Sequence, residues 1–289
     1  MNDHPGRDQA VGEGAVGERA GDPWRPHPLL DVDQPAEGIL RLAMRQPAKK
    51  NALNAAMREA LFERLEAAAV DPAVRAVVLT GAEGTYSAGG DLQGLQAVEP
   101  ADFRAYLQRG HRLVQLLYRF EKPTVAAIEG VGVGGGLALA LCCDAIVMGR
   151  SARVGFTFLR IGFVPDWGTL HTLGRRVGPA RARQLFLDPQ LMDAERALAI
   201  GLADEAADDG RVQDTALATA VRLAGQAPRA YALTKRLLQT LPADLDGALE
   251  AELIAQQSCF AGPEFREGVA AFLARRPPDF RRLSGQEAG

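Results

Sequence analysis

Two glycine-rich segments are the parts of this sequence that offer backbone groups for chemistry. They are Ser87-Ala88-Gly89-Gly90-Asp91-Leu92 and Gly130-Val131-Gly132-Val133-Gly134-Gly135-Gly136. Each follows a short apolar run that predicts a buried strand. Small residues let a ligand approach the main chain closely. One N–H group from each segment could therefore point at the same oxygen atom and form an oxyanion hole that uses no side chain.

The second segment also matches the G-x-G-x-x-G pattern of a dinucleotide site through Gly130, Gly132 and Gly135. That pattern needs an acidic residue about 20 positions later, at the end of the next strand. Asp144 comes too early and precedes the next predicted strand, and the GK[ST] sequence of a P-loop does not follow. A tight turn packed against a neighbouring segment is the purely structural interpretation.

The sequence around other reactive side chains gives little support for a catalytic role. Asp91 could act as a base, although an aspartate that follows glycines more commonly caps a helix or closes a turn. Ser87 lacks the G-x-S-x-G setting of a hydrolase nucleophile. His111 and His171 are interpreted as packing or surface residues, and His171 is the better candidate for a second proton carrier.

The elements that must position these groups alternate between strands and helices. The apolar patterns predict strands at Gly38–Met44, Ala76–Thr80, Thr124–Ile128 and Ala145–Met148, and helices from Leu53 to about Ala69, at Phe103–Phe120 and at Gly135–Cys142. From about Pro179 onward the patterns are almost all helical, most clearly at Pro228–Leu238, Leu245–Cys259 and Glu264–Arg275. We therefore predict an α/β core at residues 37–225 and a helical C-terminal region at residues 226–289.

The N-terminal residues 1–36 differ from the rest of the chain. They are rich in Gly, Pro and charged residues and show little apolar periodicity. This composition predicts a flexible arm, with ordered structure beginning near Gly38. Trp24 is the residue that could hold the arm against the surface.

The composition limits the partners and the setting. The 289 residues include 33 basic and 36 acidic side chains, a formal net charge of −3, which argues against nucleic acid as the main partner. No apolar run reaches the roughly 20 residues of a membrane span, so we expect no membrane association. Cys142, Cys143 and Cys259 cannot build a disulfide framework and lack C-x-x-C spacing, so we expect a cytoplasmic protein without a metal site.

Several motifs, in order along the chain, resemble those of the enoyl-CoA hydratase/isomerase (crotonase) superfamily. They are Pro47-x-x-x-Asn51-Ala52-Leu53, Val77-Val78-Leu79-Thr80-Gly81, the segment at 87–92, Pro123-Thr124-Val125-Ala126-Ala127-Ile128-Glu129-Gly130 with the following glycines and Cys143-Asp144, Ile161-Gly162-Phe163-Val164-Pro165-Asp166, and Phe265-x-Glu267-Gly268-x-x-Ala271-Phe272-Leu273. The resemblance extends from about Gly38 to about Phe280. It implies an α/β fold, a spiral of ββα units with a helical C-terminal part that forms homotrimers, often paired into hexamers.

The resemblance also implies an acyl-CoA thioester substrate, with coenzyme A as part of the substrate and no separate cofactor. By position, the backbone N–H groups of Gly90 and Gly135 would stabilise an enolate. Contacts to coenzyme A would come from Lys50, Ala52, Leu53, Ala88 and Leu92. Phe272 and Arg275 match positions that reach toward the adenine nucleotide, often from a neighbouring subunit, although a solvated helix end is an equal alternative for Arg275.

The resemblance favours isomerase over hydratase chemistry. The positions of the two glutamates of typical hydratases are occupied by Ala138 and Phe158, neither of which can move a proton. Asp166 matches the acid/base aspartate of relatives that shift double bonds in enoyl-CoA thioesters, including the ring-opening isomerases of phenylacetate breakdown. Phe163 and Trp167 beside it would exclude water and raise its pKa. On local grounds, Pro-Asp before a helix is an ordinary N-cap, and both roles can coexist.

The favoured function is therefore double-bond isomerisation of an enoyl-CoA in fatty acid metabolism, with Asp166 as the single acid/base. A hydratase or a CoA-thioester hydrolase of the same fold, with water activated by unrecognised groups, is one alternative. A catalytically silent member that only binds acyl-CoA is the other.

Overall fold

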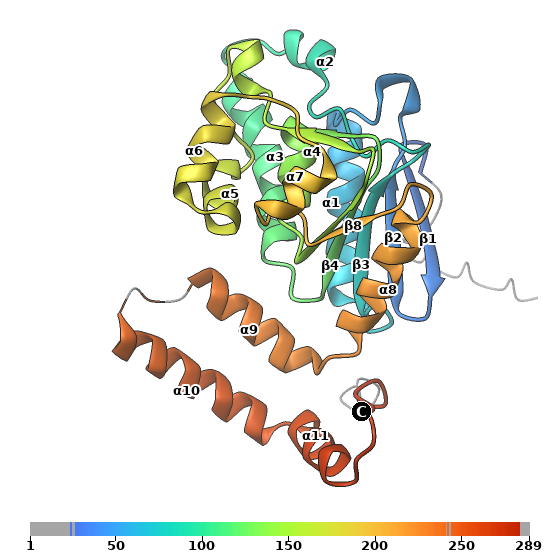
Figure 1. Ribbon diagram of the computed structural model, residues 1–289, viewed down its shortest axis with the longest axis vertical. Coiled ribbons are helices and arrows are strands. Elements are labelled where there is room, and N and C mark those ends of the chain that lie inside the picture. Colours follow the sequence, from blue (N-terminus) through green and yellow to red (C-terminus); the bar gives the residue numbers. More distant parts are fainter. Residues whose placement is uncertain (1–23, 25–26, 241, 243, 284–289) are drawn as a thin grey trace, which may run out of the picture.

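A six-stranded sheet forms the centre of the molecule in a computed structural model, which describes residues 24, 27–240, 242 and 244–283 (Figure 1). Its strands are β1 (Leu30–Ala36), β2 (Ile39–Met44), β3 (Ala76–Gly81), β4 (Thr124–Ile128), β6 (Ala145–Gly149) and β8 (Glu205–Ala207). They lie in the order β1-β2-β3-β4-β6-β8, with β1 antiparallel to β2 and every other pair parallel. Because parallel strands end at the same edge, the glycine-rich segments after β3 and β4 emerge side by side.

A second, two-stranded sheet carries the chain into the second glycine segment. It pairs β5 (Val131–Val133) with β7 (Arg153–Gly155) in parallel. The sequence patterns did not predict these strands, or β8, because three residues are too few to show a period.

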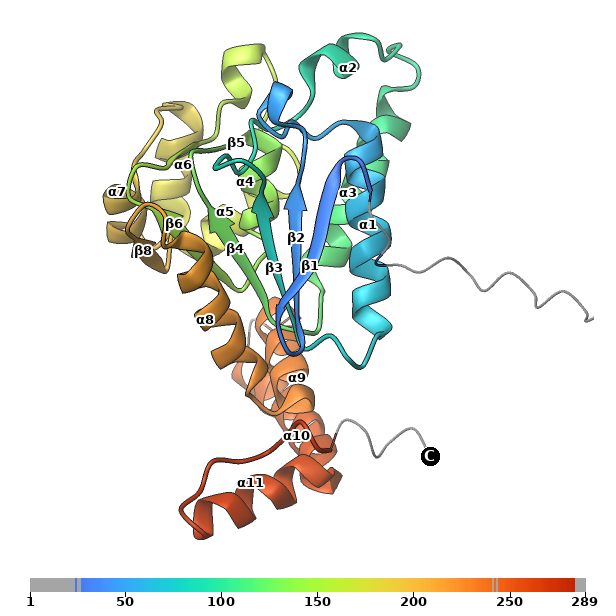
Figure 2. The same cartoon turned by 90° about the vertical axis from the view of Figure 1, so that its right-hand side faces the viewer.

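Helices cover both faces of the six-stranded sheet. On one face lie α1 (Ala55–Val70), α3 (Phe103–Tyr118) and α4 (Gly134–Ala140), and on the other lies α8 (Val212–Ala224) (Figure 2). The remaining helices are α2 (Leu92–Gln96), α5 (Thr169–Val177), α6 (Pro179–Leu187), α7 (Ala194–Ala199), α9 (Pro228–Thr240), α10 (Leu245–Ala261) and α11 (Pro263–Leu273), with 3-10 turns at Pro47–Lys49 and Phe158–Ile161. The fold is the predicted mixed α/β spiral of ββα units.

Alternate residues of the central strands enter two different apolar layers. In β3, Val77 and Leu79 belong to the cluster under α1 and α3, whereas Ala76 and Val78 belong to the cluster under α8. Side chains alternate along a strand, so a strand covered on both faces is apolar throughout. This is why β3 and β4 were predictable as short apolar runs.

The prediction that ordered structure begins near Gly38 was wrong, because residues 30–36 form β1. This is an edge strand with polar residues, and its weak apolar period hid it. Asp33 pairs with Arg41 at 2.6 Å and Asp31 with Arg45 at 2.9 Å, both across the β1–β2 hairpin. Trp24 packs, half-buried, against the main apolar cluster. Residues 1–23 and 25–26 of the predicted arm lie outside the described residues.

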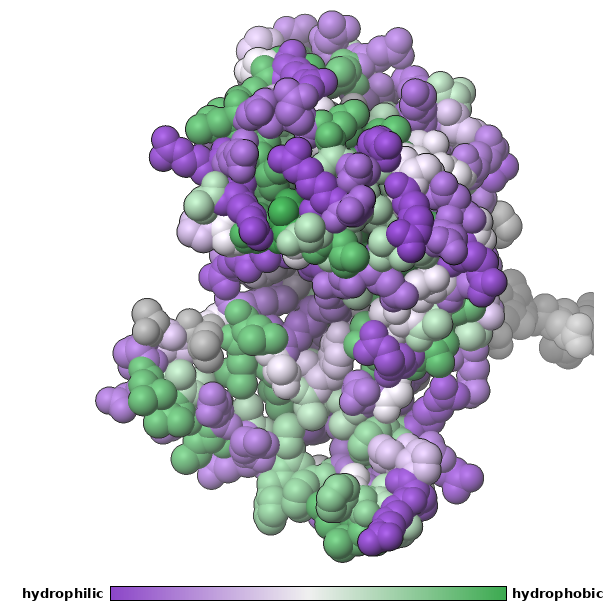
Figure 3. Space-filling view, viewed as in Figure 1, coloured by the Kyte–Doolittle hydropathy of each residue, from purple (hydrophilic) through white to green (hydrophobic). Residues whose placement is uncertain are grey.

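The C-terminal helices bury very little of their own surface. All three predicted helices are present as α9, α10 and α11, and Ala271 is their one buried residue. Large apolar side chains stay exposed, among them Leu245, Leu249, Leu253, Phe260 and Phe272. Figure 3 shows this apolar surface over the lower part of the molecule. None of the described helices combines the length and the apolar character needed to cross a membrane.

Candidate active site

The two glycine-rich segments pack directly against each other where they leave β3 and β4. The N–H group of Val133 donates to the Ser87 carbonyl at 3.0 Å. A Cβ atom on Gly136 would lie 2.6 Å from the Ser87 Cβ, and one on Gly89 would lie 2.9 Å from the Val133 carbonyl oxygen. Neither distance leaves room for a side chain, so these glycines are what lets the two segments meet.

Gly90 and Gly135 each present an unused backbone N–H group at this junction. Within the described part of the chain, neither group donates a hydrogen bond to the protein. Gly135 lies in the first turn of α4, where the backbone N–H groups have no intrahelical partner. These groups form the positive end of the helix dipole. A Cβ built on Gly89 would lie 3.5 Å from the Gly135 nitrogen, and one on Gly90 would meet nothing within 4 Å. Both amides therefore border the same open space.

That space is a cavity of about 110 Å³. Gly90 and Gly135 are part of its wall, and the charged groups that line it are Arg58, Asp91 and Asp166. Its large apolar lining comes from Leu92, Leu95, Leu107, Phe158, Ile161, Phe163 and Trp167. An apolar wall with a few convergent polar groups is the usual lining of a site for a small molecule.

Asp166 is the carboxylate in this cavity that has no partner for one of its oxygens. Its Oδ1 is buried and accepts no hydrogen bond from any described residue. Burial raises the pKa of Asp166 to about 6, and a backbone hydrogen bond opposes the shift. The predicted N-cap role does not occur, because Gly168 precedes α5 and the N–H of Thr169 donates to the Asp166 backbone carbonyl rather than to its carboxylate. The side chain is left available to the cavity.

Asp91, the other carboxylate in the cavity wall, is held by Lys49. The Lys49 Nζ lies 3.1 Å from Oδ2 and 3.2 Å from Oδ1 of Asp91. Burial tends to raise the pKa of Asp91, but Lys49 and the backbone N–H groups of Gly94 and Gln93 lower it overall. Asp91 is the residue before α2, and the Gln93 and Gly94 N–H groups that lower its pKa belong to the first turn of that helix. A carboxylate with a lowered pKa is a weak base, so Asp166 is the better proton acceptor.

The segment predicted to bind coenzyme A lies beside the first glycine segment. The Lys50 carbonyl accepts from the N–H of Ala88 at 2.8 Å, and the N–H of Leu53 donates to the Gly89 carbonyl at 2.7 Å. Ala88 and Leu92 line the cavity, Lys50 is exposed beside it, and Ala52 and Leu53 are buried. The structure therefore brings these five predicted positions together around one junction.

Asn51 fixes the position of the segment that precedes α1. Its backbone is left-handed, with φ of 54°, and its side chain is fully buried. The side-chain amide donates to the carbonyls of Ala82 at 3.0 Å and Thr85 at 2.6 Å, and the Ser87 hydroxyl donates to the Asn51 carbonyl at 2.8 Å. These bonds tie the start of α1 to the loop that carries Gly90.

Phe272 and Arg275 do not lie at the cavity of their own chain. Both are exposed at the end of α11, at the opposite end of the molecule from α2 and α4 (Figure 1). Of the two positions that carry glutamates in typical hydratases, Phe158 lines the cavity and Ala138 is fully buried.

The alternatives weighed for other residues receive no support from their positions. His171 is exposed, with Nε2 at 3.2 Å from the Tyr118 hydroxyl, and His111 is exposed on α3. Neither histidine lines the cavity. The second glycine segment contains β5 and the start of α4, which leads to β6, the parallel neighbour of β4. Asp144 lies before β6 rather than at its end, and it accepts from the Thr124 N–H and from Lys235, both at 2.8 Å, so the acidic residue of a dinucleotide site is not in place. The described residues contain no group of His, Cys, Asp and Glu that could hold a metal ion.

Arg58 is the charged residue of the cavity that the sequence patterns did not single out. It lies on α1, is 4% exposed and lines the cavity. The sequence does contain a signal for Arg58. Its spacing from Leu61 and Leu65 places it on the apolar face of the helix, where a charged residue is unusual.

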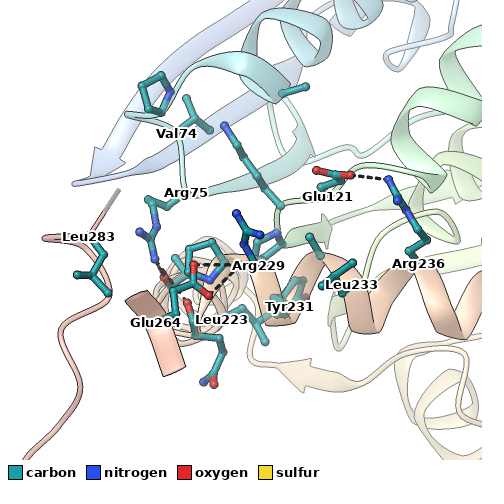
Figure 4. A pocket seen from close by; sticks show the side chains of 18 of the residues that line it. Val74, Arg75, Glu121, Leu223, Arg229, Tyr231, Leu233, Arg236, Glu264 and Leu283 are labelled. Atoms are coloured by element: carbon teal, nitrogen blue, oxygen red, sulfur yellow. Dashed lines mark hydrogen bonds and ion pairs between the residues drawn. The ribbon is translucent and has the colours of Figure 1, made fainter. Parts of the chain in front are cut away.

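A larger cavity, of about 460 Å³, lies between the core and the C-terminal helices (Figure 4). Its charged side chains are engaged with one another or with the backbone. Glu264 accepts from the Arg229 N–H at 3.1 Å, Arg236 pairs with Glu121 at 3.1 Å, and Lys122 donates to two carbonyls near the end of α1. This cavity lies away from the glycine junction, and none of the charged groups named above is free to act as a base.

Comparisons with known proteins identify the family of the chain. The sequence profile of the family described as enoyl-CoA hydratase/isomerase matches residues 34–283. Two relatives from Escherichia coli K12 are each 34% identical and align with 84% of this chain and 95% of their own length: a 2,3-dehydroadipyl-CoA hydratase and a 1,2-epoxyphenylacetyl-CoA isomerase. The crystal structure of an enoyl-CoA hydratase from Bacillus anthracis superposes with a TM-score of 0.84 at 25% identity, over 88% of this chain and 99% of that one. The chain therefore belongs to the enoyl-CoA hydratase/isomerase family of acyl-CoA enzymes.

Proposed function

We propose that this protein moves the double bond of an enoyl-CoA thioester, with Asp166 as its single acid/base and the N–H groups of Gly90 and Gly135 as its oxyanion hole. The observation that carries the proposal is the buried, unpartnered oxygen of Asp166 in the same cavity as two unused N–H groups. A raised pKa and an apolar wall suit a group that must both take and return a proton.

The proposed reaction conserves all atoms of the substrate. The thioester oxygen of a 3-enoyl-CoA accepts hydrogen bonds from the two N–H groups, and Asp166 removes a proton from C2. The electron pair of the broken C–H bond forms a dienolate whose negative charge rests on the thioester oxygen, where the two donors stabilise it. Asp166 then returns the proton at C4, which gives the conjugated 2-enoyl-CoA.

Hydration is the second candidate function, because a hydratase and an isomerase among the relatives are equally similar to this chain. Addition of water across a double bond usually needs one group to activate the water and another to deliver a proton. The side chains at Ala138 and Phe158 supply neither, and Asp91 is held by Lys49. The arrangement of carboxylates therefore supports isomerisation better.

Assembly into a homotrimer or a hexamer through α9–α11 is part of the proposal. Its support is the row of exposed apolar residues on these helices, because large apolar patches on a protein surface mark interaction sites. In such an assembly, Phe272 and Arg275 would reach the coenzyme A of a neighbouring subunit.

The test is an assay with matched substrates. Purified protein is incubated separately with 3-hexenoyl-CoA and 2-hexenoyl-CoA, followed by ultraviolet absorbance and mass spectrometry. Conversion of the 3-enoyl to the 2-enoyl thioester without a change in mass supports the proposal. Gain of one water by the 2-enoyl thioester as the faster reaction would make the protein a hydratase and overturn the one-carboxylate mechanism.

A further inference from the structure

Arg58 is a buried cation in the cavity wall that lacks an anionic partner. It is 4% exposed, and no described carboxylate forms an ion pair with it. Its Nε is buried and has no hydrogen-bond partner among the described residues. The guanidinium group stays charged in proteins, and burying a charge is costly unless it is paired.

Two aromatic rings lie close to this guanidinium. The Arg58 Cζ lies 4.2 Å from the centre of the Tyr106 ring and 5.9 Å from that of Trp167. Gly110 leaves the room for this arrangement, because a Cβ at that position would lie 3.4 Å from the Arg58 Nη1 and 3.3 Å from Trp167. Burial lowers the pKa of Arg58 and Arg109 adds to this effect, while Tyr106 opposes it.

A guanidinium over an aromatic ring makes a cation–π contact that does not use its N–H donors, and the Arg58 Nε has no hydrogen-bond partner among the described residues. Those donors match the two oxygens of a carboxylate. Tyr106 and Trp167 line the same cavity as Arg58, so a ligand in the cavity would lie beside the guanidinium. Arg64, a second buried arginine on α1, differs in both respects: it does not line the cavity, and Glu63 lies 3.8 Å from it.

We propose that the acyl group of the substrate carries a carboxylate at its far end, and that Arg58 binds this carboxylate. The substrate class is then the CoA thioesters of short dicarboxylic acids. The inference rests on the proposed function for the thioester end, since the oxyanion hole fixes one end of the acyl chain and Arg58 would fix the other. The small volume of the cavity favours a short chain between the two.

Binding of unreactive thioesters tests the inference separately from catalysis. Isothermal titration calorimetry of the full-length protein would compare two saturated pairs, adipyl-CoA with hexanoyl-CoA and glutaryl-CoA with pentanoyl-CoA. The members of each pair differ only in the terminal carboxylate. At least one dicarboxylyl thioester is expected to bind about 10- to 100-fold more tightly than its partner, as a hydrogen-bonded charge pair would give.

Variants then assign the preference to Arg58. Arg58→Gln is expected to remove it, so that the two members of each pair bind with equal affinity. Arg58→Lys, which keeps the charge but loses the paired donors, is expected to retain part of it. Arg64→Gln is the matched control and is expected to keep the full preference. Thermal unfolding monitors the folding of each variant, and the wild-type comparison stands even where a variant fails to fold.

The outcomes separate this inference from the proposed function. Equal affinities within both pairs for the wild type would overturn the inference and leave the proposed function intact. A preference that survives in Arg58→Gln would overturn the assignment to Arg58. Failure of all four thioesters to bind would overturn the proposed function and the inference together.

Discussion

The core and the C-terminal helices differ in how far their apolar residues are buried within the chain. Every residue of β3 and β4 is buried within the chain, whereas α9 and α10 contain no buried residue. The helices are attached to the core through polar contacts, such as Lys235 with Asp144 at 2.8 Å. The cavity, its two unused amides and Asp166 all belong to the core. This difference supports the two proposals that one chain supplies the catalytic groups and that the helices make contacts beyond the chain.

The largest expected effect concerns the two carboxylates of the core cavity. Asp166→Asn is expected to lower kcat by about 10³-fold without a loss of folding, because a positioned acid/base typically contributes about 10²- to 10⁴-fold. The measurement is steady-state turnover of 3-hexenoyl-CoA together with circular dichroism.

Asp91→Asn is the matched control for that variant, and a decrease of less than about tenfold is expected because Lys49 already holds Asp91. Comparable losses in the two variants would show that the cavity does not distinguish its carboxylates and would contradict the one-carboxylate mechanism.

The second prediction addresses the helices. Leu245, Leu249 and Leu253 lie four residues apart on one face of α10, and each is at least half exposed. The double variant Leu249→Glu, Leu253→Glu is expected to weaken self-association by about 100-fold or more, since it places charges in an apolar contact. Sedimentation equilibrium measures the change.

Val70→Glu, at an exposed apolar residue of α1, is the control and should leave the mass of the assembly unchanged. An undiminished assembly in the double variant would mean that the exposed face of α10 is not the contact.

The third prediction tests the packing of the glycine segments. Gly136→Ala places a Cβ 2.6 Å from the Ser87 Cβ, so the free energy of unfolding is expected to fall by about 1–3 kcal/mol. Chemical denaturation measures the decrease. Gly174→Ala, at a helical glycine of α5 with nothing within 4 Å of the added atom, is expected to leave stability unchanged or to raise it by up to about 1 kcal/mol. Equal stability of the two variants would argue against the close contact.

The smallest expected effect is the pH dependence of the core reaction. Asp166 must be ionised to remove the C2 proton, and its pKa is raised to about 6. The value of kcat/KM is therefore expected to be level above about pH 7 and to fall about tenfold per unit below about pH 6, since it reports the free enzyme. A profile that rises as the pH falls through 6 would show that the protonated carboxyl is the active form.

Buried strands could be predicted from the sequence, whereas an edge strand and the hydrogen bonding of the glycine segments could not. The strands at Ala76–Gly81 and Thr124–Ile128 were predictable because both of their faces are buried in apolar layers. The edge strand Leu30–Ala36 was missed because its exposed aspartates pair with arginines across a hairpin, which sequence periodicity does not detect. The two glycine segments could be paired from their positions after two strands, and the family resemblance singled out Gly90 and Gly135. Their unused N–H groups could be seen only in the folded chain.

Local sequence and tertiary structure gave different answers at Asp166. Pro165-Asp166 before a helix is typical of an N-cap, yet Gly168 takes the N-cap position of α5 and the Asp166 carboxylate remains without that bond. The sequence is equally incomplete at Arg58. Its spacing places it on the buried face of α1 but does not reveal its contacts with Tyr106 and Trp167 in the cavity wall.

The sequence by itself determined the family, the main strands and helices, and the types of the residues available for chemistry, because these depend on local pattern and on motifs in register. Only the tertiary structure decided which of these groups are free to react. Hydrogen-bond partners, burial and pKa depend on residues far apart in the chain: Lys49 engages Asp91, no described residue engages the Oδ1 of Asp166, and the cavity between them exists only when β3, β4 and α1 are packed together.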